Sequence, residues 1–441
     1  MAEVRPFRGT RYNPEAIGDL SLVVAPPYDV ISDEGRDAFY NKHPYNVVRL
    51  ILNRPKRNDP DPEQPYRRAA DFIDRWTAQR ILITDTSPGI YLYRQRYLLE
   101  GQYKECTGLV ARVRLEEFSA GGILPHEEIM PRPFADRMKL LERTRMNLDL
   151  IQTLYSDPTE RLKDPILAEL ERFPAAQFQT GDGVAHDLWA VTEDRFVTKM
   201  STFFKGKPLY IADGHHRYQT SLEYSLRLRE SGEIADDDDP RNFMMMMIVE
   251  MENPGLTVLP VHRVVLSPGV DVARLLSDLS RWFAVEEVEV PKGARSGQVY
   301  HLLKLLRERP GPAFGAFLGD ERFALLTPGE GLDVVSEAGG GSPSSHAGLD
   351  VTVLQKLVFE RTLGIAADRE SVESTLCFTR DPLEAVGMVD SGAASYVFFV
   401  NPTPVEQVRE VADDGEKMPQ KSTYFYPKPF SGVVMNRITE W

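Results

Sequence analysis

One stretch constrains the fold of this chain more than any other: residues 207–230, which read KPLYIADGHHRYQTSLEYSLRLRE. A short apolar run over residues 209–212 is followed by Asp213 and Gly214, and apolar residues then recur with helical spacing as far as Glu230. This pattern predicts a buried strand, a tight turn and an amphipathic helix. Gly214 marks the turn, because glycine adopts backbone conformations that other residues avoid.

The residue types around this turn are those that bind phosphate. Backbone N–H groups at a helix start carry partial positive charge, and Arg217 offers a planar fork that suits phosphate oxygens. Gly214, His215, His216 and Arg217 are therefore candidate phosphate- or nucleotide-binding residues, and Asp213 is a candidate catalytic residue that could hold Mg²⁺ against the phosphate. The alternative is that Asp213 only caps the helix, with the histidines packed at its start. The His-His-Arg triplet favours the phosphate site.

A second candidate element is the triplet His126-Glu127-Glu128, in the loop before a helix predicted over residues 136–147. A carboxylate that follows a glycine-rich loop can act as a general base toward a hydroxyl group. Glu127 is the candidate base, His126 accompanies it as a catalytic candidate, and Glu128 is the next choice. The alternative is a surface run of charge. A zinc-protease motif is excluded, because Met130 stands where the second histidine of His-Glu-x-x-His would be.

Three further residues could line the same cleft: Asp29, Arg137 and Arg263. Asp29 belongs to the string APPYDVIS, a loop after a strand predicted over residues 21–25, and it is a further candidate for the base. The alternatives are structural, with Asp29 as a cap and Arg137 paired to a neighbour on its helix. Arg263 follows a predicted strand end, where a second arginine would suit a phosphate.

The composition is that of a globular protein and excludes several classes. Lysine and arginine number 52 against 66 aspartates and glutamates, so the net charge is −14, which argues against a protein that coats nucleic acid. A small basic pocket stays compatible with this total. Two cysteines rule out a disulfide framework and a Cys-rich zinc site. No signal sequence or membrane span is predicted, so a cytoplasmic protein is expected. The acidic residues 235–242 are expected to form an exposed, solvated loop, and the Met-rich residues 243–251 a buried strand.

Five strings resemble the bacterial and archaeal family called domain of unknown function 1015. They are APPYDVIS, PHEEIMPRPFADRMKLL, YIADGHHRYQTSLEY, PGLTVLPVHRVV and MPQKSTYFYPK. These strings run from the N-terminal to the C-terminal region, so the resemblance covers nearly the whole chain. The family label itself implies no function.

A narrower resemblance is to the ParB/sulfiredoxin-like superfamily, carried by PHEE, the helix that follows it, and the strand-DGHHRY-helix unit. In the free-serine kinases of this superfamily, the glutamate of a His-Glu pair is taken as the base for the serine hydroxyl. The aspartate of the turn is taken as a partner in phosphoryl transfer. The resemblance assigns these roles to Glu127 and Asp213, and it assigns the phosphate-contacting end of the turn to His216 and Arg217.

The mixture of hairpins and separate helices predicts an α+β fold. Residues 1–118 read as an N-terminal α/β region with a β-hairpin over 89–117. The resemblance implies a ParB/sulfiredoxin-like core over residues 119–264, with an insertion over about 155–205, because the two motifs are 213 − 127 = 86 residues apart. Residues 265–441 read as a C-terminal α+β region.

The leading functional expectation is a phosphotransferase that acts on a small hydroxyl compound such as free serine. The donor would be a nucleotide or pyrophosphate, with Mg²⁺ as a possible cofactor. The alternatives are a nucleotide-binding switch or slow nucleotide hydrolase, and a non-catalytic interaction protein. The expected partner is a small-molecule substrate and not a membrane or nucleic acid, and the oligomeric state is left open.

Overall fold

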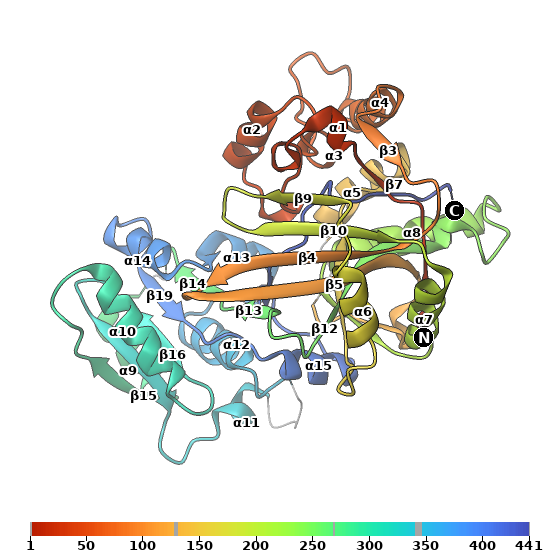
Figure 1. The fold of residues 1–441 in the computed structure, drawn as a ribbon. Helices are drawn as coiled ribbons and strands as arrows, with labels where there is room; N and C mark the ends of the chain where they lie inside the picture. Colours follow the sequence, from red (N-terminus) through yellow and green to blue (C-terminus); the bar gives the residue numbers. More distant parts are fainter. Residues whose placement is uncertain (1, 128–130, 268–269, 340–345, 441) are drawn as a thin grey trace. The chain divides into compact units, whose positions relative to one another are not determined.

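The computed structural model describes residues 2–127, 131–267, 270–339 and 346–440. These residues form two compact units (Figure 1). The first unit comprises residues 2–125, 131–257 and 427–440, and the second comprises residues 126–127 and the described part of 258–426. The chain therefore leaves the first unit and later returns to it. The sequence predicted three regions, and whether each of them folds as an independent domain stays a prediction.

The first unit is built on a mixed sheet, for which nine strands are described. Their order is β6-β11-β8-β12-β5-β4-β10-β9, and β1 pairs with β5. Strand β8 runs parallel to β12, β6 runs parallel to β11, and the other neighbouring pairs are antiparallel. The strands are β1 Val4–Arg5, β4 Ile90–Leu99, β5 Gln102–Arg114, β6 Ile123–Leu124, β8 Ile151–Tyr155, β9 Ala176–Gln179, β10 Ala185–Val191, β11 Leu209–Asp213 and β12 Phe243–Glu250.

Two predicted features of this sheet are confirmed. Strands β4 and β5 form the expected hairpin around Glu100 and Gly101, whose φ angles of 49° and 78° belong to a two-residue hairpin turn. The Met-rich stretch forms β12, which is buried along residues 243–249 because it lies between β5 and β8 and is covered on both faces. Its methionines are core side chains.

Helices surround this sheet, and the same unit contains two separate two-stranded ladders. Figure 1 shows α1–α4 gathered beside β9, where Phe178 packs against the same apolar cluster as Trp76. The helices are α1 Pro14–Ile17, α2 Asp33–Lys42, α3 Val48–Ile51, α4 Gln64–Ala78, α5 Pro131–Thr144, α6 Lys163–Leu170, α7 Asp194–Phe204 and α8 His215–Glu230. The ladders pair β2 Thr10–Tyr12 with β3 Leu82–Thr84, and β7 Met146–Asn147 with β21 Asn436–Arg437.

Two local expectations need correction. The strand expected over residues 21–25 is instead a 3₁₀ turn, Leu20–Leu22, because the Asp19 carboxylate accepts a hydrogen bond from the Ser21 N–H and starts a turn there. The helix expected over 136–147 begins earlier, at Pro131, and ends at Thr144. Proline suits the first turn of a helix, and Arg145 leaves the helix with a φ of 51°.

The second unit contains a six-stranded antiparallel sheet in the order β15-β17-β16-β19-β14-β18. Its strands are β14 His262–Val265, β15 Phe283–Val288, β16 Phe314–Phe317, β17 Phe323–Pro328, β18 Leu376–Thr379 and β19 Tyr396–Phe399, and a separate ladder pairs β13 Thr257–Leu259 with β20 Tyr424–Tyr426. Its helices are α9 Val272–Leu279, α10 Arg295–Arg307, α11 Val334–Ala338, α12 Asp350–Val353, a π-helix Leu354–Thr362, α13 Arg369–Thr375, α14 Pro382–Asp390 and α15 Val405–Asp413. The protein is thus a mixed α/β structure with one large mixed sheet.

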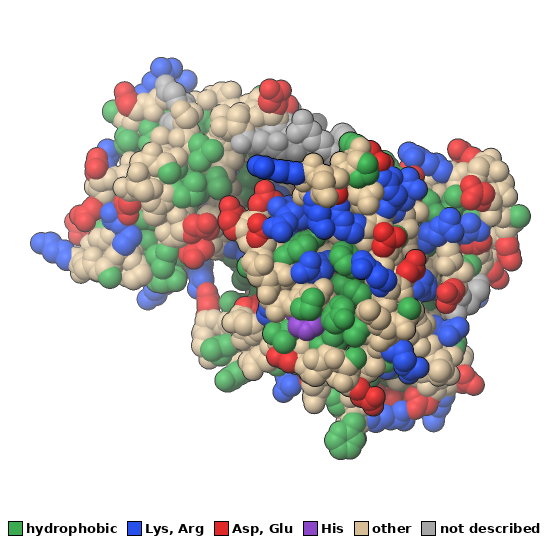
Figure 2. All heavy atoms as spheres, turned by 90° about the horizontal axis from the view of Figure 1, so that it is seen from above, with side chains coloured by type: hydrophobic (Ala, Val, Ile, Leu, Met, Phe, Trp, Pro, Cys, Tyr) green, Lys and Arg blue, Asp and Glu red, His purple; other side chains and the backbone are tan. Residues whose placement is uncertain are grey.

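Charges of both signs are spread over the surface despite the net charge of −14. The face in Figure 2 carries acidic and basic side chains, and lysines and arginines gather near its centre. No helix among the described residues combines the length and the apolar character needed to cross a bilayer.

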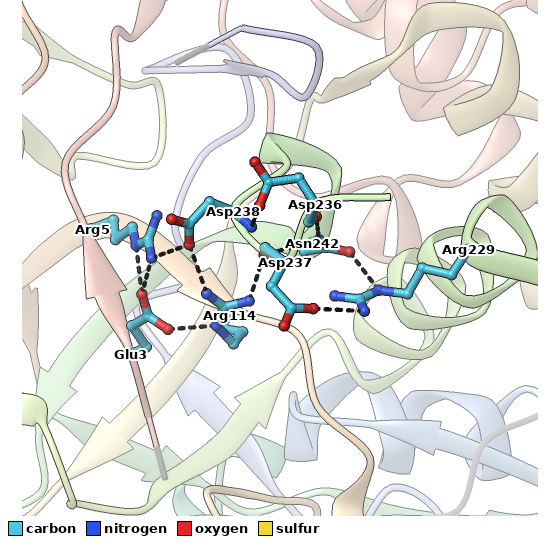
Figure 3. Close-up of polar contacts among 8 residues, drawn as sticks. All are labelled: Glu3, Arg5, Arg114, Arg229, Asp236, Asp237, Asp238 and Asn242. Atoms are coloured by element: carbon cyan, nitrogen blue, oxygen red, sulfur yellow. Dashed lines mark hydrogen bonds and ion pairs between the residues drawn. The ribbon is translucent and has the colours of Figure 1, made fainter. Parts of the chain in front are cut away.

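The acidic loop, residues 236–239, is held by arginines (Figure 3). Arg5 and Arg114 donate to the Asp238 carboxylate over 2.6 Å and 3.3 Å. Arg229 donates to the Asp237 carboxylate over 2.9 Å. The loop is exposed, as expected, but these three arginines fix its conformation.

Candidate functional site

The predicted strand, turn and helix around Asp213 are confirmed. Asp213 is the last residue of β11, and α8 begins at His215. Gly214 joins them in the left-handed region, with φ 99° and ψ 28°. A Cβ atom on Gly214 would lie 3.0–3.1 Å from the guanidinium of Arg217, so that side chain folds back over the turn and packs against its backbone. The glycine is required twice, by its φ angle and by this close approach.

Asp213 lies between two cations. One carboxylate oxygen accepts from Arg217 Nη2 over 2.5 Å, and the other accepts from Lys428 Nζ. The side chains of Asp213, Arg217 and Lys428 are only 12%, 5% and 9% exposed. These three residues, called the Asp213 trio below, carry one positive charge in excess in a site that excludes most water.

The pKa values of the trio reflect this arrangement. Burial by itself raises the pKa of Asp213, but the charges of Lys428 and Arg217 outweigh it and hold that pKa far below its ordinary value. Burial lowers the pKa of Arg217, whereas Asp213, followed by Asp29 and Asp149, raises it and prevails. Asp213 and Arg217 are therefore both charged at neutral pH.

A second group of side chains surrounds Arg217 within the first unit. The guanidinium of Arg137 lies 4.0 Å from the ring centroid of Tyr28 and donates to the Ile51 carbonyl over 2.9 Å. Burial raises the pKa of Tyr28 to about 12, against the opposing charges of Arg137 and Arg217. Asp29, the neighbour of Tyr28, is exposed, and its charge acts on both Tyr28 and Arg217.

Asp149 is the buried acid of this group. The residue is 6% exposed, and its carboxylate accepts a hydrogen bond from the Ser431 hydroxyl. Burial raises its pKa, and the charge of Arg217 and the Ser431 hydrogen bond only partly offset this. Arg137, Asp149 and Arg217 together line a cavity of about 40 Å³, room for about one water molecule.

A buried amide lies beside the strand end. Gln152 of β8 is the cross-strand partner of Asp213, and it is fully buried. Neither polar atom of its side chain has a hydrogen-bond partner among the described residues. Buried polar groups are nearly always paired, so an unpaired amide here points to a water or ligand at this end of the sheet.

The His126-Glu127 element belongs to the second unit. The Glu127 carboxylate accepts from the backbone N–H of Lys421 over 3.3 Å, and the His126 carbonyl accepts from the N–H of Met418 over 2.9 Å. His126 Nε2 lies 3.0 Å from the Thr423 hydroxyl. This element therefore packs against the string MPQKSTYFYPK. Glu128 lies outside the described residues.

Arg263 also belongs to the second unit, where it is buried in β14. Its guanidinium donates to the backbone carbonyls of Val261 and Lys421. Burial lowers its pKa to about 10.

The predicted site residues thus fall into two groups. Asp29, Arg137, Asp213 and Arg217 come together in the first unit, where His215 is buried and His216 half-buried at the start of α8. The second unit holds His126, Glu127 and Arg263. The convergence of Glu127 on the Asp213 turn stays a prediction.

Sequence reasoning missed Lys428, Asp149, Gln152 and Ser431. Lys428 closes the trio although it lies 215 residues beyond Asp213. A signal was present, because Lys428 and Ser431 belong to PKPFSG, where a lysine between two prolines is poorly suited to a helix or a central strand. Asp149 and Gln152 carry no comparable signal.

The residues at Asp213 offer little for a metal ion. Among the described residues, no group of three His, Cys, Asp or Glu side chains could hold one. Both oxygens of Asp213 already accept from cations, so a Mg²⁺ ion bound to this carboxylate would lie beside two positive charges that oppose its binding. Asp213 as a Mg²⁺ ligand stays a prediction, and no step below passes through the metal.

Solved structures include several of low similarity to this chain. A conserved hypothetical protein from Pyrococcus furiosus is 15% identical, over 74% of this chain and 93% of that chain, with a TM-score of 0.34. A free serine kinase in complex with AMP is 14% identical, over 72% and 86%, with a TM-score of 0.34. SbnI with a C-terminal truncation, from Staphylococcus aureus, is 12% identical, over 73% and 85%, with a TM-score of 0.34. TM-scores of this size do not establish a shared fold or activity.

Family membership rests on the sequence. No curated protein matches the chain. The family described as protein of unknown function, DUF1015, matches residues 4–352, most of the chain and the two motifs around Glu127 and Asp213. The chain belongs to the DUF1015 family.

Proposed function

We propose that the protein transfers a phosphoryl group from a nucleotide or pyrophosphate to a small hydroxyl compound such as free serine. In this proposal the Asp213 turn binds the phosphate, and the sheet and helices around it form a ParB/sulfiredoxin-like core. The observation that carries the proposal is the Asp213 trio, in which two nearly buried cations share one carboxylate beside a glycine turn at the start of α8.

The chemistry of the trio suits a phosphate group. Arg217 uses Nη1 for the Leu150 carbonyl and Nη2 for Asp213, and a guanidinium has five N–H donors in all. The remaining donors suit phosphate oxygens, and the two cations of the trio favour an anion, although the charges of Asp29 and Asp149 also act on Arg217. Asp213 holds both cations in place before the ligand arrives, so little reorganisation is needed.

The transfer step assigns one role to each group. The oxygen of the acceptor hydroxyl forms a bond to the transferring phosphorus, and the bond between that phosphorus and the leaving phosphate oxygen breaks. Glu127 takes the hydroxyl proton as general base, with His126 beside it. Arg217 stabilises the charge on the transferring group. Gly214, His215 and His216 bring the backbone of the helix start to the phosphate.

The first experiment tests phosphate binding with a matched pair of arginine variants. Arg217 and Arg227 both lie on α8 and both pair with an acid four residues before them. We expect Arg217→Ala to weaken the binding of ADP or pyrophosphate by ~10–100-fold, since a hydrogen bond to a charged group contributes about 1.5–3 kcal/mol. Arg227→Ala removes only the exposed pair with Glu223 and should leave binding unchanged. The measurement is isothermal titration calorimetry.

Arg217→Lys separates binding from folding. This variant keeps a positive charge beside Asp213 but loses the planar guanidinium. It should therefore have the thermal unfolding midpoint of the parent and still bind ADP and pyrophosphate less tightly. If Arg217→Lys and Arg217→Ala both bind ADP and pyrophosphate as the parent does, the turn is only a helix start and the proposal is wrong.

A second candidate function is nucleotide binding with slow hydrolysis and no acceptor. The observation in its favour is that both oxygens of Asp213 are engaged by cations, which leaves this acid poorly placed for chemistry on a substrate. Donor consumption with and without serine distinguishes the two. Consumption that depends on serine supports transfer, and consumption without serine supports hydrolysis.

A further inference from the structure

The first unit contains a large groove away from the Asp213 turn. Its volume is about 890 Å³, and its lining comes from α7, the loop that follows α7 and the residues before α6. We call it the α7 groove and define it by Arg161, Arg195, Lys199, Phe203, Lys205 and Lys207. The loop residues Lys205 and Lys207 precede β11, whereas Asp213 ends it, so the two sites lie at opposite ends of this strand.

The α7 groove is strongly basic in an acidic protein. Five of its lining residues are lysine or arginine and one, Asp194, is acidic, while the whole chain carries a net charge of −14. Arg195, Lys199 and Lys205 are exposed and have no ion-pair or hydrogen-bond partner among the described residues. Arg195 and Lys199 are four residues apart on α7, where like charges repel and disfavour the helix. The repulsion between these two side chains thus lowers the stability of α7, and the fold tolerates this loss while it keeps positive charge in the groove.

Two of the cations are held in fixed positions by an aromatic ring. The guanidinium carbon of Arg161 and the Nζ atom of Lys207 lie 4.7 Å and 4.6 Å from the centroid of Phe203. The ring itself packs edge-on against Tyr155, with the ring centroids 5.8 Å apart. Lys207 Nζ also donates to the Ser156 carbonyl over 3.1 Å. These contacts orient the charges before any ligand binds, which lowers the entropy lost on binding.

We propose that the α7 groove binds a small molecule with three or more linked phosphates, such as a nucleoside triphosphate or inorganic triphosphate. Asp194 offsets one of the five positive charges, and the Asp157 carboxylate lies 3.9 Å from Arg161 Nε. The three positive charges that remain still call for a ligand with more negative charge than one phosphate monoester carries. The volume falls within the range of about 300–1,000 Å³ that is typical of small-molecule sites. This site is distinct from the phosphate site proposed at Asp213 and does not depend on it.

The test measures binding of inorganic triphosphate to Lys199→Glu and to a matched control. Lys304 is an exposed lysine on α10 of the second unit, and Lys304→Glu makes the same change of charge. We expect Lys199→Glu to weaken triphosphate binding at least tenfold by calorimetry at physiological salt. Lys304→Glu should change it less than twofold. Equal effects of the two variants would mean that only the net charge matters, and would overturn the proposal.

Three further binding measurements distinguish a phosphate site in the α7 groove from the alternatives. In Arg217→Ala, triphosphate binding at the α7 groove should persist. If triphosphate binding is lost in Arg217→Ala and unchanged in Lys199→Glu, the α7 groove is not a ligand site, while the Asp213 site stands. The other two measurements test binding to two separate probes. One probe is a vesicle that contains phosphatidylserine, and the other is a single-stranded oligonucleotide. Binding of either one that depends on Lys199, without binding of triphosphate, would replace the small molecule by a membrane or nucleic acid and overturn the proposal.

Discussion

Gly214 combines a left-handed backbone with the guanidinium of Arg217 packed against its α-carbon. We expect Gly214→Ala to destabilise the first unit, because the left-handed conformation costs an L-residue ~1–2 kcal/mol and the added methyl must also push Arg217 aside. Gly387→Ala is the matched control. Gly387 lies in α14 with no atom within 4 Å of its Cβ position, so alanine there should stabilise the helix by up to ~1 kcal/mol. Urea unfolding measures both, and equal effects of the two variants would contradict the strain at Gly214.

His186 gives the stability of the protein a dependence on pH. Its ring is stacked on Phe178 at 4.7 Å, and its two nitrogens lie 2.7 Å from the Tyr93 hydroxyl and 3.0 Å from the Thr180 hydroxyl. Burial lowers its pKa to about 4, against the opposing charges of Asp182 and Asp187. The unfolded chain, with a histidine pKa of ~6.5, therefore takes up a proton before the folded chain does.

The sign of the effect follows from this order of protonation. The stabilisation from neutral, buried His186 is complete above pH ~6.5, and it is lost as the pH falls from there toward 4, by up to ~1.4 kcal/mol per pH unit. We expect the urea midpoint to fall between pH 7 and pH 5, and to fall less in His186→Asn. His262, whose pKa burial lowers to about 3, remains in the variant and keeps part of the slope. An unchanged slope in His186→Asn would show that His186 does not titrate in this range.

At the residue scale, the sequence predicted the residues of the candidate site that belong to the β11–α8 turn. Asp213, Gly214 and Arg217 could be recognised because the strand, turn and helix that place them are all local. The PKPFSG string marks Lys428 as unusual, but its pairing with Asp213 could not be predicted, because that contact depends on the return of the chain after 215 residues. Asp149 could not either, since nothing local distinguishes a buried aspartate from a surface one.

At the scale of elements, the acidic loop depends on charge for its conformation. Both guanidinium groups that bind Asp238, those of Arg5 and Arg114, also bind Glu3 and lie over the ring of Phe243 at 4.7 Å and 4.6 Å. Burial raises the pKa of Glu3, but Arg114 and Arg5 lower it further, so the net shift is downward. The hydrogen bond from Arg5 likewise lowers the pKa of Asp238. The contacts are therefore complete above the ordinary values of 4.5 and 3.8 and weaken as the pH falls below them.

We expect Asp238→Asn to loosen this loop without unfolding the sheet. Amide hydrogen exchange over residues 235–242 should become about twofold to fivefold faster, in line with the small contribution of exposed ion pairs. High salt should bring the parent toward the variant, because it screens exposed charges. Glu287 of β15 has an exposed ion pair with Arg322, and Glu287→Gln, which removes it, is the control that should leave exchange in the acidic loop unchanged. Unchanged exchange in Asp238→Asn would mean that backbone contacts alone hold the loop.

Elements with strong local patterns could be predicted, and those set by distant contacts could not. The β4–β5 hairpin and the β11–α8 unit were found from alternation, turn residues and helical spacing. The apolar residues 21–25 read as a strand, but a cap at Asp19 made a 3₁₀ turn more favourable. The π-helix Leu354–Thr362 and two-residue strands such as β7 have no sequence pattern of their own, because packing and a distant partner define them.

At the scale of the whole molecule, residues 427–440 complete the first unit after the chain has formed the second. Val434, Met435 and Asn436 are each at most 1% exposed, and Arg112, itself 1% exposed, donates to the Asn436 side chain and the Arg437 carbonyl over 2.7 Å. A chain that ends at Tyr426 would leave this guanidinium buried without these partners, which is strongly destabilising.

We therefore expect the chain ending at Tyr426 to lose the protection of the first unit. Hydrogen exchange in β5 and β12 should rise to the rate of an unfolded chain, while β16 and β19 of the second unit stay protected. Asn436→Ala in the full chain is the milder variant and should lower the thermal midpoint of the first unit without abolishing its fold. Protection of β5 in the shortened chain would contradict this role of residues 427–440.

The return of the chain also has a consequence for its synthesis on the ribosome. Residues 258–426 are made before Lys428 and Ser431, which at ~5–20 residues per second takes about 10–30 s. During that interval Asp213 and Arg217 have already been translated, but Lys428, the second cation of the trio, does not yet exist. A nascent chain interrupted between Tyr218 and Pro427 therefore carries the whole DGHHRY motif and still lacks the Lys428 side of the candidate phosphate site.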